Sequence, residues 1–253
     1  MTEFDRKQGQ RVLDAIADFQ QSRDQSDLWS HVHRHLSHFG VGGIWYGFEI
    51  QPERGKKLSE MKQAFMLASL DPAYVDAKMN DLLIDDDYCA QMARMGTKPI
   101  LWNDIPPSDR LTAAERRSFE IDADYKMISG VTMPSRFACG LGTSSFACHA
   151  DGMSGGEFER MWGENGDAIQ SIASAFDICL REGHMGEVYS LSSREREVLL
   201  WLTRGLRPQR IASRLSLHEG TVEKHIESAR RKLKAATVTQ AVATAVIFRL
   251  IAP

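Results

Sequence analysis

One stretch near the C-terminus carries polar side chains at the spacing that a DNA-contacting helix needs. Lys224, Ser228 and Arg231 recur at intervals of four and three residues, which places them on one face of a helix. Thr221 and Glu227 flank that face. Cations there can pair with phosphates and guanine edges, and a carboxylate can accept from cytosine. The spacing therefore indicates a helix that lies in the major groove of double-stranded DNA.

The surrounding residues contain the signals for two short helices before this longer one. Ser192 and Glu195 form a capping-box pair, Gly205 is placed to end the first helix, and Pro208 to begin the second. Apolar residues then recur at helical spacing at Val198, Leu199, Leu202, Ile211, Ala212, Leu215, Val222, Ile226, Ala229 and Leu233. The pattern is typical of a helix-turn-helix, and with a last helix near Val242 it predicts an all-α, four-helix unit.

The charge of the chain is divided between its two parts. Residues 191–253 hold 12 Lys and Arg against 5 Asp and Glu, a net charge of +7, whereas residues 1–190 have a net charge of −10. A solvated charged face is the alternative explanation for the charged helix, but the concentrated positive charge favours DNA. Arg207 and Gln209, at the start of the second helix, are therefore also expected to contact DNA.

The hydrophobic period changes several times before residue 190, which predicts an α+β fold. Apolar residues recur at helical spacing over 12–19 and 28–39, and they alternate from Ile44 to Ile50. The other expected elements are strands over 64–70, 131–133 and 143–150, a helix opened by Thr112 and Glu115, and a long helix over about 166–182. Together they predict an α-β-α sandwich with a mainly antiparallel sheet.

The composition is that of a soluble globular protein, with 43% hydrophobic and 26% charged residues among 253. No apolar run approaches the roughly 18 residues needed to cross a bilayer, and the first residues do not resemble a secretion signal. We therefore expect a cytoplasmic protein without a membrane partner. The four cysteines are widely separated, which predicts free thiols instead of disulfides or a zinc site.

Two further groups have residue types suited to chemistry but lack the rest of a site. His31, His35 and His38 share a helical face, yet no nearby acid or cysteine completes a set of metal ligands. Ser145 and His149 could serve as nucleophile and base, but no nucleophile-elbow motif and no orienting acid accompany them. We expect no metal, cofactor or catalysis, and an enzyme-like or metal-binding sensor is kept as a remote alternative.

Residues 191–253 resemble the LuxR-type helix-turn-helix over essentially their whole length. The resemblance is carried by Leu191-Ser-Ser-Arg-Glu-Arg-Glu-Val-Leu199, Glu219-Gly-Thr-Val222, Arg231-Lys-Leu233 and Thr239-Gln-Ala-Val242. It implies a transcriptional regulator that binds an operator and has RNA polymerase as a further partner.

The second half of residues 1–190 resembles the acyl-homoserine-lactone-binding domain of LuxR-family quorum-sensing receptors. The carrying residues are Asp87, Trp102 fifteen positions on, the run 129–134, and Gly140 with Gly142. By this resemblance Asp87 accepts the ligand amide N–H, Trp102 donates to the lactone carbonyl, and Ser145 faces the polar end. The other residues expected at the ligand are Tyr74, Lys78, Tyr88, Met127 and Gly130.

The sequence departs from the family pattern at the expected pocket. Tyr74 stands where the family has Trp, Lys78 where it has Tyr, Tyr88 where it has Pro, and Asp122 at a usually small position. If Lys78 and Asp122 point inward, the pocket is more polar than one for an acyl chain; alternatively they pair or face solvent. A lactone-type signal is the first expectation, and another small molecule or a ligand-free constitutive dimer are the alternatives.

Two apolar stripes are expected to mediate dimers, because a two-fold dimer matches a palindromic operator. The first comprises Ile169, Ile172 and Phe176, for which packing on the sheet is the alternative, and the second comprises Val242 and Val246. The expected organisation is a ligand-binding and dimerisation domain over residues 1–182, a flexible linker over 183–190, and a DNA-binding domain over 191–253.

Overall fold

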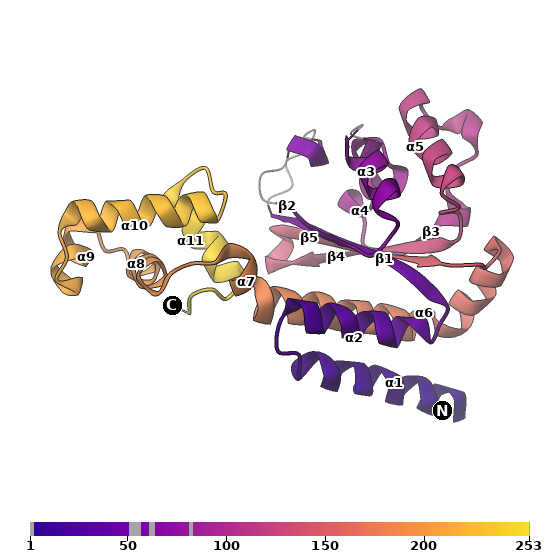
Figure 1. Cartoon of the computed structure of the whole chain (residues 1–253), viewed down its shortest axis with the longest axis horizontal. Helices are drawn as coiled ribbons and strands as arrows, with labels where there is room; N and C mark the ends of the chain where they lie inside the picture. The colour runs from indigo at the N-terminus through magenta and orange to yellow at the C-terminus, as the bar shows by residue number, and fades with distance from the viewer. Residues whose placement is uncertain (1–2, 51–56, 61–63, 81–82, 253) are drawn as a thin grey trace. The chain divides into compact units, whose positions relative to one another are not determined.

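The computed structural model describes residues 3–50, 57–60, 64–80 and 83–252. The backbone divides into two compact units, Met1–Asp177 and Ile178–Pro253, and each is considered by itself (Figure 1). Within the described ranges, no helix has the length and apolarity that a membrane span requires.

The N-terminal unit is built on a five-stranded sheet in which every pair of neighbours is antiparallel. Its strand order is β2-β1-β5-β4-β3. The strands are β1 (Val41–Ile50), β2 (Ala64–Ala68), β3 (Ile100–Leu101), β4 (Gly130–Phe137) and β5 (Gly142–Ala150). The four predicted strands are present, and the two-residue β3 adds an edge that no alternating pattern signals.

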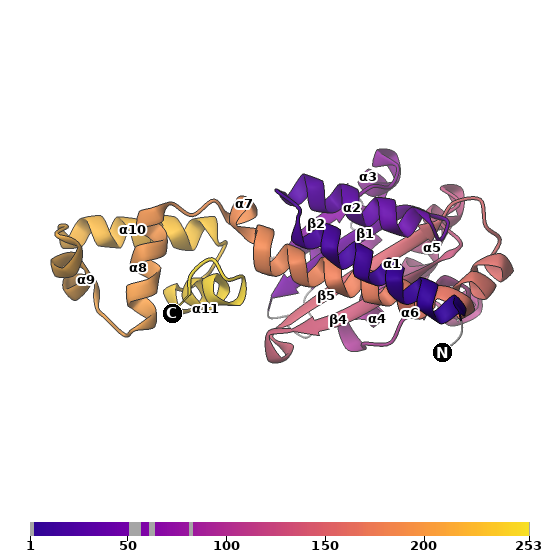
Figure 2. The same ribbon diagram turned by 90° about the horizontal axis from the view of Figure 1, so that it is seen from below.

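Helices cover both faces of this sheet, which confirms the predicted α-β-α sandwich (Figures 1 and 2). On one face lie α1 (Glu3–Gln20), α2 (Gln25–Ser37) and α6 (Gly155–Cys179). On the other lie α3 (Pro72–Asn80), α4 (Tyr88–Met95) and α5 (Ala113–Asp124). Thr112 and Glu115 form the expected capping box at the start of α5.

Alternate residues of the strands serve the two faces, because side chains of a strand point to opposite sides. Tyr46 and Phe146 face the α6 side, where both rings contact Phe176. The Tyr46 hydroxyl donates to Asp177 at 2.6 Å, so this buried polar group is satisfied. Their sequence neighbours Trp45 and Ser145 point to the other face, where they line a cavity.

The long helix α6 begins eleven residues before the predicted start near Gly166. The Ser154 and Glu157 side chains each bond the other's backbone N–H at its first turn. Gly166 lies within this helix, and the Trp162 ring packs over it, 3.0 Å from where a Cβ would stand.

The C-terminal unit is helical, as predicted. Its elements are α7 (Met185–Tyr189), α8 (Ser193–Thr203), α9 (Pro208–Leu215), α10 (Glu219–Lys232) and α11 (Val238–Ile247). The Ser192–Glu195 capping box is present, and Gly205 has the left-handed φ of +75° expected after α8. His218 caps α10 by accepting from the Gly220 N–H at 3.3 Å. Val198, Ile211, Ala212, Val222 and Ile226 form a buried core, as their spacing predicts.

The segment predicted to be a flexible linker is instead helical. Leu180–His184 forms a π-helical turn, and α7 follows it directly. Met185 and Tyr189 are buried, and the Tyr189 ring stacks on Phe248 with centroids 5.5 Å apart. Its two glycines, Gly183 and Gly186, suggested flexibility, but these apolar contacts hold the segment in a helix.

Candidate functional site

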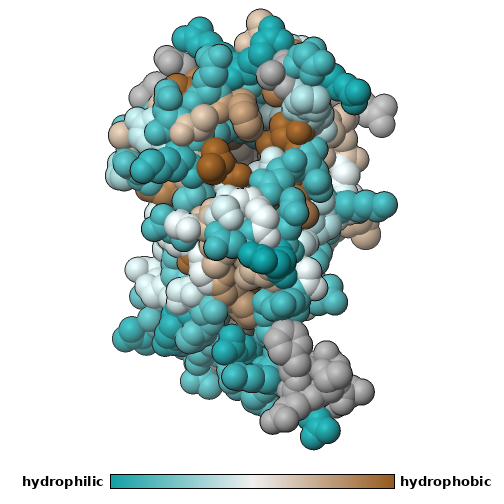
Figure 3. Space-filling model, turned by 90° about the vertical axis from the view of Figure 1, so that its right-hand side faces the viewer, coloured by the Kyte–Doolittle hydropathy of each residue, from teal (hydrophilic) through white to brown (hydrophobic). Residues whose placement is uncertain are grey.

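A cavity of about 420 Å³ lies in the N-terminal unit, lined by residues of the sheet and of α3, α4 and α5. Seven of the residues expected at a ligand line it, namely Tyr74, Lys78, Asp87, Tyr88, Trp102, Met127 and Ser145. Phe119 and Ile128 also line the cavity while being 40% and 50% exposed. In Figure 3, hydrophobic side chains border a hollow on the face of this unit.

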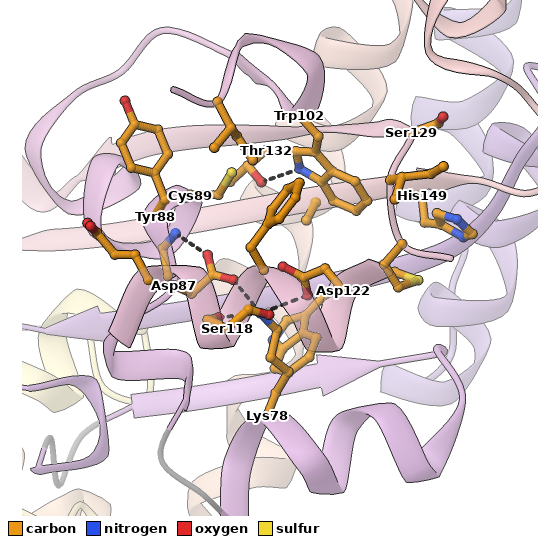
Figure 4. A pocket seen from close by; sticks show the side chains of 18 of the residues that line it. Lys78, Asp87, Tyr88, Cys89, Trp102, Ser118, Asp122, Ser129, Thr132 and His149 are labelled. Carbon is orange, nitrogen blue, oxygen red and sulfur yellow. Dashed lines mark hydrogen bonds and ion pairs between the residues drawn. The ribbon is translucent and has the colours of Figure 1, made fainter. Parts of the chain in front are cut away.

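Lys78 lies at the polar end of the cavity with only 1% of its side chain exposed. Its ammonium contacts Asp87 Oδ2 at 2.8 Å, Asp122 Oδ1 at 2.7 Å and Ser118 Oγ at 2.7 Å (Figure 4). The Ser118 carbonyl oxygen is a fourth acceptor at 3.3 Å, so the three protons of the ammonium are all used by the protein. Lys78 and Asp122 therefore both point into the cavity and also pair with each other there. The sequence had offered these as two separate alternatives.

Each carboxylate of this network has a second contact that fixes its position. Asp87 caps α4, because its Oδ1 accepts from the Ala90 N–H at 2.8 Å. Asp122 Oδ1 also accepts from the Tyr74 hydroxyl at 2.7 Å. Tyr74 and Lys78 stand one turn apart on α3, so one helical face supplies both donors. We call Tyr74, Lys78, Asp87, Ser118 and Asp122 the polar network.

Burial and charge shift the pKa values of this network in opposite directions. Burial, together with the nearby Asp87 charge, raises the pKa of Asp122 to about 6 against the opposing effect of Lys78. Burial lowers the pKa of Lys78, but the charges of Asp87 and Asp122 outweigh it, so the net shift is upward. Burial and the same carboxylates raise the pKa of Tyr74. Lys78 and Tyr74 are thus protonated at neutral pH.

Trp102 lies at another part of the cavity and stacks on His149, with ring centroids 6.1 Å apart. Its indole N–H donates to Thr132 Oγ1 at 3.0 Å. A Cβ on Gly130 would stand 2.7 Å from this indole ring and 2.3 Å from the Cys148 carbonyl oxygen. Gly130 does not line the cavity, contrary to its expected place at a ligand: it lacks a side chain so that Trp102 can lie against the strand.

Sequence reasoning did not assign a ligand contact to several residues that line the cavity. Ser118, Ser129, Thr132 and His149 are among them. His149 had a usable signal, since Ser145, Ala147 and His149 alternate along β5 and share its cavity face. Ser118 had none, because its role depends on Lys78, which is forty residues away.

A second, largely apolar cavity of about 230 Å³ adjoins the first. The two share the lining residues Trp45, Ile84, Ala90 and Ser145. Its remaining wall includes Phe48, Phe65 and Met66 from the neighbouring strands β1 and β2, and the buried Glu49–Arg94 ion pair. A molecule with a polar head and an apolar tail thus meets suitable surfaces in the two cavities.

His31 and His35, of the histidine group singled out in the sequence, are engaged in structural contacts. His35 Nε2 pairs with Asp18 Oδ2 at 2.7 Å, and His31 Nδ1 lies 3.0 Å from Ser22 Oγ. In the part of the chain that the structure describes, no cluster of three or more metal-ligating side chains occurs. All four cysteines are free, and Cys139 is exposed.

The face of α10 predicted to contact DNA is open at its two cations. Lys224 and Arg231 are exposed, whereas Glu227 is held by Arg230 at 2.7 Å. The Ser228 side chain bonds to the Glu195 carboxylate, so it joins α10 to α8 and is not an open contact. Thr221 is half-buried on the same helix.

The start of α9 presents the other residues predicted to contact DNA. Arg207 and Gln209 are exposed there, on either side of Pro208. The guanidinium groups of Arg204 and Arg214 lie over the Trp201 ring, 5.1 and 4.6 Å from its centroid. These arginines extend the positive charge of the unit along α8 and α9.

The apolar stripe predicted to mediate dimers on α6 belongs to the core of the N-terminal unit. Ile169 and Ile172 are no more than 1% exposed, and Phe176 contacts the rings of Phe19 and Tyr46. The prediction for these three residues is therefore wrong, because packing on the sheet already covers them. On α11, by contrast, Val242 is half-buried and Val246 is 37% exposed.

Family models account for both units of the chain. The autoinducer-binding domain matches residues 24–179, more than half of the chain, and the domain described as bacterial regulatory proteins of the luxR family matches residues 189–245. The chain belongs to the LuxR family of autoinducer-binding regulators. It is therefore a transcriptional regulator with a sensor unit and a DNA-binding helix-turn-helix unit.

Two curated relatives agree with this assignment for the LuxR-family chain. It is 31% identical over 165 residues to the putative HTH-type transcriptional regulator y4qH of Sinorhizobium fredii. The aligned residues make up 63% of this chain and 48% of y4qH. The chain is 26% identical over 170 residues to the transcriptional activator BjaR1 of Bradyrhizobium diazoefficiens, covering 66% of this chain and 67% of BjaR1. The match thus spans about half of y4qH.

Solved structures share the fold of this LuxR-family regulator at low sequence identity. Escherichia coli SdiA superimposes with a TM-score of 0.54 at 16% identity. The match covers 96% of this chain and 98% of the SdiA chain. CepR2 of Burkholderia cenocepacia, described as N-acylhomoserine lactone dependent, has a TM-score of 0.52 at 11% identity over 69% of this chain and 95% of its own.

Proposed function

We propose that this LuxR-family regulator is a cytoplasmic homodimer that senses an acyl-homoserine lactone or a related small molecule and binds a palindromic operator. The observation that carries the ligand class is the placement of Asp87 and Trp102 on the wall of one cavity. A carboxylate acceptor and an indole donor suit the amide N–H and the carbonyl of one neutral ligand.

The cavity surfaces support such a ligand from head to tail. The indole N–H of Trp102 donates to Thr132, and a lactone carbonyl is an acceptor that can take the place of that hydroxyl. The adjoining apolar cavity, with Phe48 and Phe65 in its wall, suits an acyl chain. The description of CepR2 as lactone dependent supports the same ligand class.

The C-terminal unit supports operator binding through two exposed surfaces. Lys224 and Arg231 are free for phosphates or base edges on α10, and Arg207 and Gln209 are exposed at the start of α9. A two-fold dimer would present two such surfaces to a palindromic site. Such a regulator acts through RNA polymerase and needs neither a cofactor nor a catalytic group.

A thermal-shift and titration experiment tests the ligand class. We expect members of a lactone panel to raise the melting temperature of the protein, because a ligand that binds only the folded state stabilises it. Trp102→Phe removes the indole donor and should weaken the best lactone by about 1–3 kcal/mol. Trp162→Phe, on α6 outside the cavity, is the matched control and should bind normally.

Two other outcomes would contradict the proposal in different ways. If an extract of the cells that produce the protein stabilises it but no lactone does, the ligand is another small molecule and not a lactone. Stabilisation by neither, combined with operator binding by the untreated protein, would indicate a constitutive dimer that needs no ligand.

A further inference from the structure

We propose that the signal carries a second hydrogen-bond donor, a hydroxyl on the third carbon of its acyl group, which Asp122 accepts. This inference rests on the lactone-type ligand proposed above and specifies its acyl part. It comes from the polar network around Lys78, which stands at a position that the sequence marked as unusual for the family.

Lys78 is not free to bind a ligand. Its three protons go to Asp87, Asp122 and Ser118, at 2.8, 2.7 and 2.7 Å. The hydroxyl proton of Tyr74 likewise goes to Asp122. An acyl carbonyl, which can only accept, therefore finds the ammonium and the phenol already committed to carboxylates.

The two carboxylates, in contrast, have acceptor capacity to spare. Together they offer about eight lone-pair positions, and fewer than that number of donors reach them. Asp122 Oδ2 has no hydrogen-bond partner in the part of the chain that the structure describes. One ammonium between two carboxylates also leaves the ionised network with an excess negative charge. This end of the cavity therefore favours a ligand that donates.

The geometry limits how far apart the two ligand donors lie. Asp87 Oδ2 and Asp122 Oδ1 bind the same ammonium, so their separation cannot exceed the sum of 2.8 and 2.7 Å, and the unpartnered Oδ2 belongs to the same Asp122 carboxylate as Oδ1. A hydroxyl on the third acyl carbon is four bonds from the amide nitrogen, which spans at most about 5 Å. One ligand can thus donate its amide N–H to Asp87 and that hydroxyl to Asp122.

A separate observation shows that the cavity accommodates polar ligand atoms. Ser129 lines it and is 1% exposed, and its hydroxyl has no hydrogen-bond partner among the described residues. An unsatisfied buried hydroxyl is uncommon in a folded protein. A ligand atom that bonds to Ser129 would satisfy it, which a purely alkyl ligand could not do.

The acyl substituents of lactones provide a direct test. The probes are three acyl-homoserine lactones of one chain length that carry no substituent, a hydroxyl or a carbonyl at the third acyl carbon. We expect the 3-hydroxy compound to bind the full chain at least tenfold more tightly than the 3-oxo compound. The carbonyl can only accept, so it would face Asp122 without a hydrogen bond.

A substitution at Asp122 sharpens the test. Asp122→Asn supplies an amide donor in place of a carboxylate oxygen, so the ratio of 3-hydroxy to 3-oxo affinity should fall at least tenfold. Asp124→Asn is the matched control, because Asp124 is exposed at the end of the same helix, and it should leave that ratio unchanged. If Asp122→Asn does not fold, the ratio measured with the unsubstituted protein decides.

The outcomes separate this inference from the proposed function. Equal affinity for the three lactones, or a preference for the 3-oxo compound, overturns the second donor and leaves the lactone ligand in place. Binding of none of them overturns the lactone ligand itself, and with it the hydroxyl. A lower 3-hydroxy to 3-oxo ratio in Asp122→Asn but not in Asp124→Asn supports the assignment to Asp122.

Discussion

The charge of Lys78 is buried, so its cost must be offset by the groups around it. Transfer of an ammonium out of water is expensive, and two carboxylates and a hydroxyl at 2.7–2.8 Å provide the compensation. The same burial makes one of those carboxylates unusually easy to protonate, because Asp122 shares a single cation with Asp87.

Asp122 should make the stability of the sensor unit depend on pH. Its pKa of about 6 in the folded protein lies above the ordinary value of 3.8, so the folded state binds this proton more tightly than the unfolded chain. The resulting stabilisation is present below about pH 4 and is lost as the pH rises through 6. Relative to Asp122→Asn, the free energy of unfolding should fall by about 1–3 kcal/mol between pH 4 and 7.

Urea unfolding at a series of pH values, followed by tryptophan fluorescence, measures this difference. Lys78, Asp87, Tyr74 and Cys89 face the same carboxyl group and remain in both proteins, so the difference isolates Asp122. Parallel curves for the two proteins would show that Asp122 keeps an ordinary pKa.

At this scale the sequence identifies the residues of the site but not their partners. Asp87, Trp102 and Lys78 were selected by type and position, and all three line the cavity. Lys78 and Asp122 are on separate helices, and only the tertiary fold determines that they meet. Gly130 was selected for the wrong reason, since its role depends on where the ring of Trp102 lies.

Helices with clear end signals can be predicted from the sequence, and these include α5 beside the cavity, whereas α3 and α4 cannot. α8 and α9 follow from Ser192, Gly205 and Pro208, because each of these residues acts within one turn of its own position. α3 has no apolar stripe, since Lys78 is buried one turn after Tyr74. Because α3 carries residues of the polar network on its buried face, its sequence lacks the apolar spacing by which a helix is predicted.

The exposed cations of α10 should contribute directly to operator binding. Lys224→Ala or Arg231→Ala should weaken binding by about 1–3 kcal/mol if the residue reads a base, or lower the salt slope by about one if it holds a phosphate. Gel-shift titrations at several salt concentrations, with a DNA fragment selected by the protein from a random pool, distinguish these cases.

The control for these variants is Lys98→Ala, which removes an exposed cation from the N-terminal unit. It should change neither the affinity nor the salt slope. If both α10 variants bind like the unsubstituted protein at matched salt, this helix does not face DNA.

For the whole molecule, the apolar surface of α11 is the predicted dimer contact that remains exposed. Val246 is 37% exposed, and Val242 is one turn before it. Val246→Asp should convert dimers to monomers at micromolar concentration, because a charge would be buried without a partner. Light scattering with and without operator DNA measures the mass.

Met95→Asp tests whether any exposed apolar residue would behave in this way. Met95 is 72% exposed at the end of α4, and its substitution should leave the mass unchanged. A dimer that persists in Val246→Asp would exclude this surface. Phe176→Asp is not a suitable probe of assembly, since a carboxylate there would disrupt the buried ring cluster of the N-terminal unit.

The helical segment before α8 determines which C-terminal fragment of this protein keeps its packing when it is cut from the rest of the chain. Tyr189 covers Phe248 near the end of the chain, and the buried Met185 precedes it by one turn. A protease that cuts after Ser190 would release four helices with the ring of Phe248 uncovered and an apolar surface prone to aggregation. The smallest fragment that keeps its packing intact therefore starts near Ile178, and the family motif alone would place that start too late.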